Sequence, residues 1–275
     1  MDTSERARRM AEATLSGAEK LGFFIPYRYA ESVKPPGPYP AFEALFQAAE
    51  DAFAATLAKI EARAEALAAL DGPPPRPRWD QEWFPRADGA AAYAIVASRR
   101  PGRIVEVGSG HSTRFMAEAA RAEGLDARIL CVDPAPRAAF NGLPVEWREE
   151  VLSEAHLPLF EELAPGDVAF FDSSHILTPG CDVDMMLNRI LPSLRPGVLV
   201  HIHDILLPDP YPEAWAWRGY AEQNALGGWL LAGGLRPVWS SRYAVTRMGA
   251  ADRGALSRIP LKDGAVETSL WAVKA

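Results

Sequence analysis

The chain has 275 residues, of which 48% are hydrophobic and 24% charged, which is typical of one large α/β domain with an appended segment. Its formal net charge of −7 argues against binding to nucleic acid, which requires a cationic surface. Two cysteines exclude a disulfide framework, and without a signal-peptide pattern or a long apolar run we expect a cytoplasmic protein that binds no membrane.

The first 80 residues are expected to form a helical extension. Residues 1–30 have a charged, alanine-rich helical pattern, and a proline-rich connector follows at 33–40. Residues 41–70 place apolar side chains three, four or seven positions apart, which predicts one strong amphipathic helix. Such an extension would act as a lid, as a packing layer or as the contact surface of a homodimer.

From residue 81 onward strand and helix patterns alternate. Continuous apolar strands between helices predict a parallel sheet covered on both faces, and two late strands predict an antiparallel pair at one edge. The fold class is therefore α/β, a doubly wound, Rossmann-like, seven-stranded sheet over residues 81–275. The expected strands are 103–107, 128–133, 145–149, 168–172, 197–204, 237–246 and 269–274, and the helices between them include 112–123, 154–163 and 182–194.

The most informative stretch joins the first expected strand to the next helix. An apolar run ends in Gly108-Ser109-Gly110, and a Ser/Thr pair follows, a pattern that predicts a buried strand turning sharply into a helix. A dinucleotide fingerprint would have a third glycine where this chain has Thr113, and no Gly-Lys-Ser/Thr of a phosphate loop follows. Asp133 ends the next strand, where its carboxylate can accept hydrogen bonds from both hydroxyls of a ribose. The alternative is a role in the turn before Pro134.

These residues resemble class I S-adenosylmethionine-dependent methyltransferases. The pattern Gly-Ser-Gly-His-Ser-Thr, with the later Asp-Ser-Ser-His, is similar to that of small bacterial methyltransferases. The resemblance implies five parallel strands plus a terminal hairpin, with the glycine loop on the methionine end of S-adenosylmethionine and Asp133 on its ribose. For His111, contact with the methionine carboxylate and packing of the turn both stay open. The expected cofactor-binding residues are Glu106, Gly108, Ser109, Gly110, His111, Ser112, Thr113 and Asp133.

Ionisable side chains gather at the expected ends of the fourth and fifth strands. In doubly wound sheets the ligand lies beyond the carboxyl ends of the strands. We therefore expect the catalytic residues among Asp172, His175, His203 and Asp204. His201 lies one pleat further inside and is expected to belong to the core.

Two mechanisms are open at these strand ends. In the first, Asp172, His203 and Asp204 bind a divalent metal that orients a substrate hydroxyl and lowers its pKa. Metal-dependent catechol and sugar O-methyltransferases, which the chain resembles in part, carry acids at the places of Asp172 and Asp204. His203 departs from their pattern, and a mixed Asp/His set suits Mn, Fe or Zn better than Mg. In the second mechanism, His175 or His203 removes the acceptor proton as a general base.

Aromatic residues are concentrated after the fifth expected strand, at 206–231. Tyr211 and Trp215 are expected to line the acceptor site. Trp83, Phe84 and Arg86 would cover the cofactor from the other side. Arg86 has two possible partners, a carboxylate of the ligand or a neighbouring side chain.

The sequence thus predicts methyl transfer from S-adenosylmethionine to a small-molecule acceptor, with oxygen as the expected acceptor atom and bacterial small-molecule methylation as the context. One alternative is an NAD(P)-dependent oxidoreductase on a similar sheet, against which Thr113 speaks. The other is a non-catalytic protein that retains the fold, against which the intact cleft residues speak.

Overall fold

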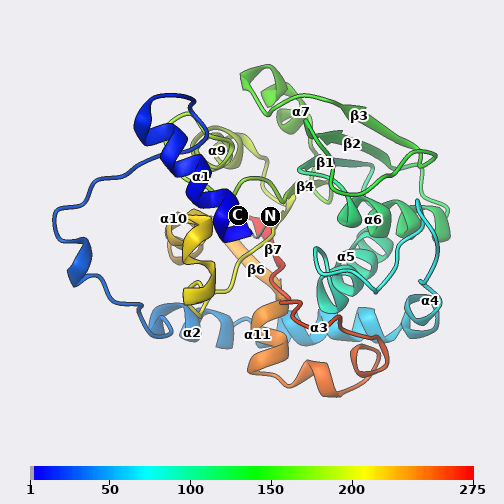
Figure 1. The fold of residues 1–275 in the computed structure, drawn as a ribbon. Coiled ribbons are helices and arrows are strands. Elements are labelled where there is room, and N and C mark those ends of the chain that lie inside the picture. The colour runs from blue at the N-terminus through cyan, green and yellow to red at the C-terminus, as the bar shows by residue number, and fades with distance from the viewer. Residues whose placement is uncertain (1–2) are drawn as a thin grey trace.

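A single mixed sheet of seven strands organises the molecule, in the order β3-β2-β1-β4-β5-β7-β6 (Figure 1). The computed structural model describes residues 3–275, so the first two residues of the expected extension lie outside the described part. β1 to β5 pair in parallel, and β7 pairs antiparallel with both β5 and β6, which confirms the predicted sheet and its edge hairpin. The strands are β1 (Arg103–Val107), β2 (Arg128–Val132), β3 (Val145–Arg148), β4 (Val168–Phe171), β5 (Leu199–Ile202), β6 (Leu235–Ser240) and β7 (Leu270–Lys274).

The register of the parallel strands aligns their carboxyl ends. Val107 of β1 lies beside Val132 and Phe171, and Phe171 lies beside Ile202 of β5. The residues that follow these four strand ends therefore stand in a row at one edge of the sheet. They are Asp133, Gly108, Asp172 and His203.

Helices cover both faces of the sheet (Figure 1). α5 and α6 pack together on one face, with α3 and α11 beyond them, and α7, α9 and α10 lie on the other. The helices are α1 (Thr3–Ser16), α2 (Pro40–Gln47), α3 (Glu50–Glu61), α4 (Ala64–Ala68), α5 (Arg86–Arg99), α6 (His111–Ala122), α7 (Leu157–Glu161), α8 (Asp182–Met185), α9 (Leu191–Ser193), α10 (Glu222–Leu231) and α11 (Ser241–Thr246). Shorter turns are the 3-10 helices η1 (Ala30–Ser32), η2 (Glu154–His156), η4 (Glu213–Arg218), η5 (Ala250–Asp252) and η6 (Leu256–Arg258), and the π-helical η3 (Met186–Ile190).

The expected amphipathic helix at 41–70 is instead three helices, α2 to α4, that share one apolar stripe. Phe46, Phe53, Ile60 and Leu67, spaced seven residues apart, are all buried in the same core as the sheet. The rings of Phe46 and Phe53 pack edge-on against Tyr243 of α11. Because this stripe packs against its own chain, it is not free to serve as a homodimer surface.

The strand expected at 237–246 was only half right. β6 ends at Ser240, whose hydroxyl accepts a hydrogen bond from the Tyr243 amide (3.2 Å) and so caps α11. Serine at this position satisfies a free amide of the first helical turn. Residues 241–246 are therefore helical.

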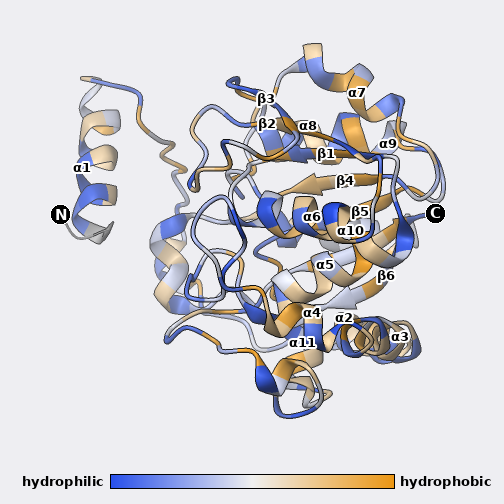
Figure 2. Cartoon of the chain, turned by 90° about the vertical axis from the view of Figure 1, so that its right-hand side faces the viewer, coloured by the Kyte–Doolittle hydropathy of each residue, from blue (hydrophilic) through white to orange (hydrophobic). Residues whose placement is uncertain are grey.

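α1 lies at the edge of the molecule, on the left of Figure 2. Between α1 and α2 the side chains of Phe23, Phe24, Ile25, Tyr27 and Tyr29 are exposed. α1 itself contacts η4 of the aromatic segment. Among the helices of residues 3–275, none combines the length and apolar character needed to cross a membrane.

Candidate active site

The glycine turn lies directly against the end of β4. Gly108 has a φ of +77°, and a Cβ there would stand 1.7 Å from the carbonyl oxygen of Asp172. Any other residue would push the two strand ends apart. Gly108 thus brings the turn after β1 next to the residues that follow β4.

Glu106 supports the turn from beneath. Its side chain has no exposed surface, and its carboxylate accepts hydrogen bonds from the hydroxyls of Ser112 and Thr113, both at 2.6 Å. Thr113 in turn accepts from the Gly110 amide at 2.9 Å. The polar groups of Glu106, Ser112 and Thr113 are thus engaged with one another inside the chain, and the cofactor contact expected for them stays a prediction.

The burial of Glu106 predicts that the stability of the chain depends on pH. Desolvation raises the pKa of its carboxyl from 4.5 to about 7, although hydrogen bonds from Ser112 and Thr113 oppose the shift. Protonated Glu106 therefore favours the folded state fully below pH 4.5, and this contribution of about 3 kcal/mol is lost as the pH rises to 7. We expect the unfolding free energy of Glu106→Gln to fall less between pH 4.5 and 7 than that of the natural chain, as measured by urea titration at each pH. A slope equal to that of the natural chain would contradict this.

Asp133 anchors the same turn from the end of β2. One carboxylate oxygen accepts from the Ser109 amide at 2.6 Å, and the other accepts from the Ala135 amide at 2.7 Å. The second bond is the turn role that Asp before proline favours. Each oxygen has a further lone pair, so a ribose role is compatible with this geometry.

Four ionisable side chains converge where β4 and β5 end. Nε2 of His175 lies 3.4 Å from Asp172 and 3.5 Å from Asp204. Nδ1 of His203 lies 3.5 Å and 3.7 Å from the same two carboxylates. The structure thus brings together all four residues expected to be catalytic. Asp172, with 27% of its side chain exposed, is the most accessible of them.

Two buried carboxylates that sequence reasoning missed hold the imidazoles from behind. Glu222, at the start of α10, lies 2.8 Å from Nδ1 of His175. Asp88, in α5, lies 3.2 Å from Nε2 of His203 and accepts from the amides of Thr268 and Ser269. Both acids lie within helices, and the only available signal was a carboxylate in an otherwise apolar pattern.

These contacts raise the pKa of both imidazoles. Burial lowers the pKa of His175, but hydrogen bonds to Asp172 and Glu222 raise it well above 6.5. Burial also lowers the pKa of His203, but the charge of Asp172 raises it, and the pKa lies well above 6.5. For Asp172, burial raises the pKa of the carboxyl, yet the two histidines hold it well below its usual range.

The backbone of the cluster is strained. His175 and Asp204 adopt φ values of +60° and +53°, and among the non-glycine residues of the described chain only Arg100 shares this conformation. Such conformations cost about 1–3 kcal/mol and concentrate at functional sites. The amide of Ala221 holds the His175 carbonyl at 3.0 Å, which ties the strained loop to α10.

The expected metal ligands do not form a ready metal centre. Within residues 3–275 no group of three or more His, Cys, Asp or Glu side chains is arranged to hold a metal ion. Asp172, His203 and Asp204 are close together, but Nε2 of His175 also faces both carboxylates. The arrangement is thus one of imidazoles paired with carboxylates.

His201 is a core residue, as expected. Its ring stacks on Phe170 with centroids 3.7 Å apart, and Nε2 lies 2.9 Å from the Ser269 hydroxyl. Burial holds the pKa of His201 well below 6.5. Phe84, expected to cover the cofactor, is likewise buried, 5.3 Å from the His203 ring.

Arg86 binds a neighbouring side chain and not a ligand. Its guanidinium donates to both oxygens of Glu267, at 2.9 and 3.0 Å. Trp83 remains exposed and lies 4.7 Å from the Arg137 guanidinium, in the loop after β2. Only Trp83 of the three expected residues is thus placed toward the cofactor side.

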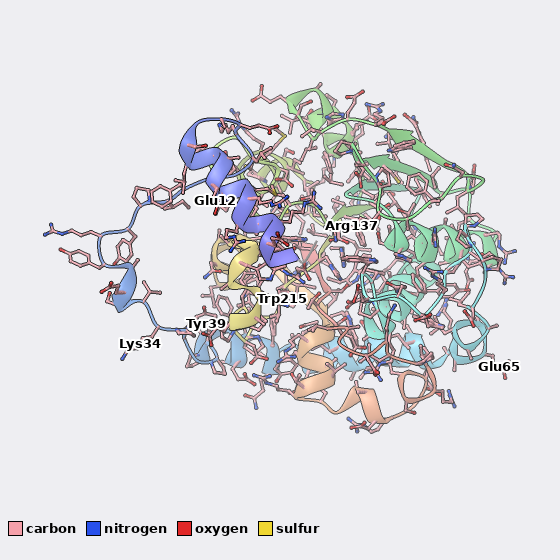
Figure 3. All side chains as sticks on the ribbon, in the orientation of Figure 1. Glu12, Lys34, Tyr39, Glu65, Arg137 and Trp215 are labelled. Atoms are coloured by element: carbon pink, nitrogen blue, oxygen red, sulfur yellow. The ribbon has the colours of Figure 1, made fainter. Side chains whose placement is uncertain are left out.

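Aromatic side chains surround one flank of the cluster. Tyr211, Trp215 and Tyr220 form a group with ring centroids 5.8–6.3 Å apart. Tyr220 lies 4.7 Å from His175, and Arg218 lies 4.0 Å from the Trp215 ring. Figure 3 shows Trp215 beside α1, in the middle of the view. The aromatic segment therefore adjoins the four ionisable residues.

Residues 105–205 match the family model described as a methyltransferase domain. The match spans the glycine turn, Asp133 and the whole ionisable cluster. It confirms the expected enzyme class for this stretch of the chain. The comparison with curated proteins found no match.

Several solved structures show a weaker similarity. An O-methyltransferase from Bacillus cereus in complex with SAH is 15% identical, with 80% of this chain and 91% of that chain covered and a TM-score of 0.37. The SAH-bound Podospora anserina methyltransferase PaMTH1 is 18% identical, with 78% and 93% covered and a TM-score of 0.39. The structure titled cmcI-D160 Mg-SAM is 14% identical, with 77% and 84% covered and a TM-score of 0.42. Similarities at this level support no conclusion about the chemistry of this chain.

Proposed function

We propose that the chain transfers a methyl group from S-adenosylmethionine to an oxygen of a small-molecule acceptor. The observation that carries this proposal is the row of Asp133, the glycine turn and the Asp172 cluster at one sheet edge, inside a methyltransferase domain. The Gly-Ser-Gly-His-Ser-Thr and Asp-Ser-Ser-His patterns favour the narrower group of small bacterial methyltransferases. A cytoplasmic location rests on the sequence alone.

The acidic side chains of the cluster suit the positive charge of a sulfonium. Four carboxylates, from Asp88, Asp172, Asp204 and Glu222, meet two imidazoles and Arg218. An excess of acids attracts a cation placed among them. Because the sulfonium is already activated, alignment of acceptor, methyl and sulfur is the main catalytic requirement.

Asp172 is the group we assign to the acceptor hydroxyl. Both ring nitrogens of His175 and of His203 already face carboxylates, so neither imidazole is free to take a proton from an acceptor hydroxyl. We assign no general-base role to either histidine. The accessible Asp172 carboxylate, whose pKa is held low by the two imidazoles, accepts a hydrogen bond from the hydroxyl and aligns its oxygen with the methyl carbon. As that oxygen attacks the methyl carbon, its proton passes to water.

A divalent metal at Asp172, His203 and Asp204 is a second candidate for activating the acceptor. The specific observation in its favour is that Asp88 holds Nε2 of His203 while Nδ1 faces Asp172, as carboxylates hold metal-ligating histidines. When bound, the metal would lower the pKa of the acceptor hydroxyl. Activity that survives chelation would contradict this candidate.

The acceptor is expected to be planar and aromatic. Tyr211, Trp215 and Tyr220 offer ring faces next to His175, and rings of this kind pack against aromatic ligands. We assign them to the acceptor site. The exposed apolar side chains at 21–33 provide the surface for a homodimer in place of α2 to α4; a chain that sediments as a monomer at every concentration would contradict that assignment.

Ligand binding tests the proposed function. We expect saturable binding of S-adenosylhomocysteine with a Kd of about 1–100 μM and no binding of NAD(P), measured by calorimetry. Binding of NAD(P) alone would establish the oxidoreductase alternative, and binding of neither would favour a non-catalytic protein.

A further inference from the structure

Arg218 stands between the aromatic segment and the ionisable cluster. It is the last residue of η4, and Gly219 after it has a φ of +67°, which turns the chain back. The next residue, Tyr220, lies with its ring 4.7 Å from that of His175. Nη1 of Arg218 lies 3.9 Å from a carboxylate oxygen of Asp204. This local turn thus brings an arginine to the flank where the acceptor is expected to bind.

Three aromatic rings lie close to the guanidinium of Arg218. Its central carbon is 4.0 Å from the ring centre of Trp215, and 5.5 and 5.4 Å from those of Trp217 and Tyr220. Cation–π contacts hold a guanidinium without using its N–H groups, which lie in its plane. A planar carboxylate can accept two of these donors side by side. The rings therefore position the guanidinium and leave its donors for another partner.

One of these donors is not satisfied within the chain. Nε of Arg218 is buried and has no hydrogen-bond partner among the residues that the structure describes. Asp204 attracts the guanidinium, but 3.9 Å is beyond hydrogen-bonding distance. The oxygens of Asp204 face Thr268 at 3.1 Å and His175 at 3.5 Å instead. Because a buried donor without a partner destabilises the protein, the free Nε points to an acceptor atom supplied by a ligand.

We propose that Arg218 binds a carboxylate of the methyl acceptor, which makes the acceptor an aromatic acid. This inference rests on the proposed function and narrows its acceptor class. Asp204, beside Arg218, and Asp172 both face Nε2 of His175, so one small acceptor can reach Arg218 and Asp172 together. An anionic group among so many acids is favourable only beside a cation, and Arg218 supplies one next to the rings.

Binding of paired aromatic compounds tests this assignment. The probes are hydroxybenzoates and hydroxycinnamates with the corresponding amides, which keep the ring and the hydroxyl but lack the charge. With S-adenosylhomocysteine bound, we expect the natural chain to prefer at least one acid over its amide by at least about tenfold, as for one charged hydrogen bond, measured by calorimetry. Arg218→Gln should remove this preference and leave the affinity for amides unchanged. Arg218→Lys, which keeps the charge without the planar fork, should show a smaller preference than the natural chain.

Arg242→Gln is the matched control. Its side chain is 30% exposed, against 28% for Arg218, and it pairs with Asp209 at 2.8 Å, so its loss should leave the preference for acids unchanged. Three results would overturn the proposal. The natural chain could bind no acid more tightly than its amide, the preference could persist in Arg218→Gln, or Arg218→Gln could weaken acids and amides equally, which would place the arginine on the acceptor hydroxyl or in a structural role. A natural chain that does not bind S-adenosylhomocysteine would instead remove the proposed function itself, so the two failures are distinguishable.

Discussion

Asp133→Ala is expected to weaken S-adenosylhomocysteine and 5′-methylthioadenosine together, each by at least about 30-fold. Both ligands carry the ribose, and losing hydrogen bonds from its hydroxyls to a carboxylate costs about 2 kcal/mol or more. The same substitution releases the amides of Ser109 and Ala135, which the carboxylate now holds. Calorimetry with the two ligands measures the effect.

Asp167 provides a control for loss of the anchor alone. It is also buried, and it accepts from the amides of Gly102 (3.0 Å), Arg103 (2.8 Å) and Ala164 (2.9 Å) at the amino ends of β1 and β4. Asp167→Ala should lower the unfolding free energy without changing either affinity. If it weakened the ligands as much as Asp133→Ala, the ribose assignment would be wrong and general destabilisation would explain both.

The sheet could be predicted from sequence because its strands are continuous apolar runs. β1 was predicted at 103–107 and is observed there, and the other parallel strands end within one or two residues of expectation. Residues 241–246, expected as strand, are helical for a local reason. Ser240 caps the helix, and Tyr243 packs on Phe46 and Phe53, a contact that the local sequence pattern does not show.

The candidate site was predictable only where the residues follow strand ends. The sequence predicts a cluster of Asp172, His175, His203 and Asp204, because parallel strands end at one edge of the sheet. The positions of Asp88 and Glu222 could not be predicted in this way, because they depend on how α5 and α10 pack. The supporting role of Glu106 was hidden for the same reason, since sequence does not tell which side of a turn an acid faces.

Asp172→Asn is expected to reduce kcat by about 10²-fold, the size of effect expected when the reacting atoms lose their alignment. The affinity for S-adenosylhomocysteine should stay close to that of the natural chain, since Asp172 is assigned to the acceptor and not to the nucleoside. Transfer of a labelled methyl group to a panel of phenols and catechols measures this. Repeating the assay after chelation distinguishes the carboxylate from a metal as the activating group.

A second measurement of Asp172→Asn does not depend on the acceptor. The charge of Asp172 and its hydrogen bond raise the pKa of His203, so their loss should lower that pKa toward 6.5, as followed by NMR. Because a raised imidazole pKa stabilises the folded state below pH 6.5 and loses this effect as the pH passes the folded pKa, the variant should lose its stability at lower pH than the natural chain.

Asp209→Asn is the matched control for Asp172→Asn. Asp209 has the same kind of partly buried carboxylate, paired with Arg242 at 2.8 Å and Arg247 at 2.6 Å away from the cluster. It should lower stability and leave both kcat and the pKa of His203 unchanged. An unchanged kcat in Asp172→Asn, with the pKa of His203 shifted as expected, would show that the carboxylate only holds the imidazole and that another group orients the acceptor.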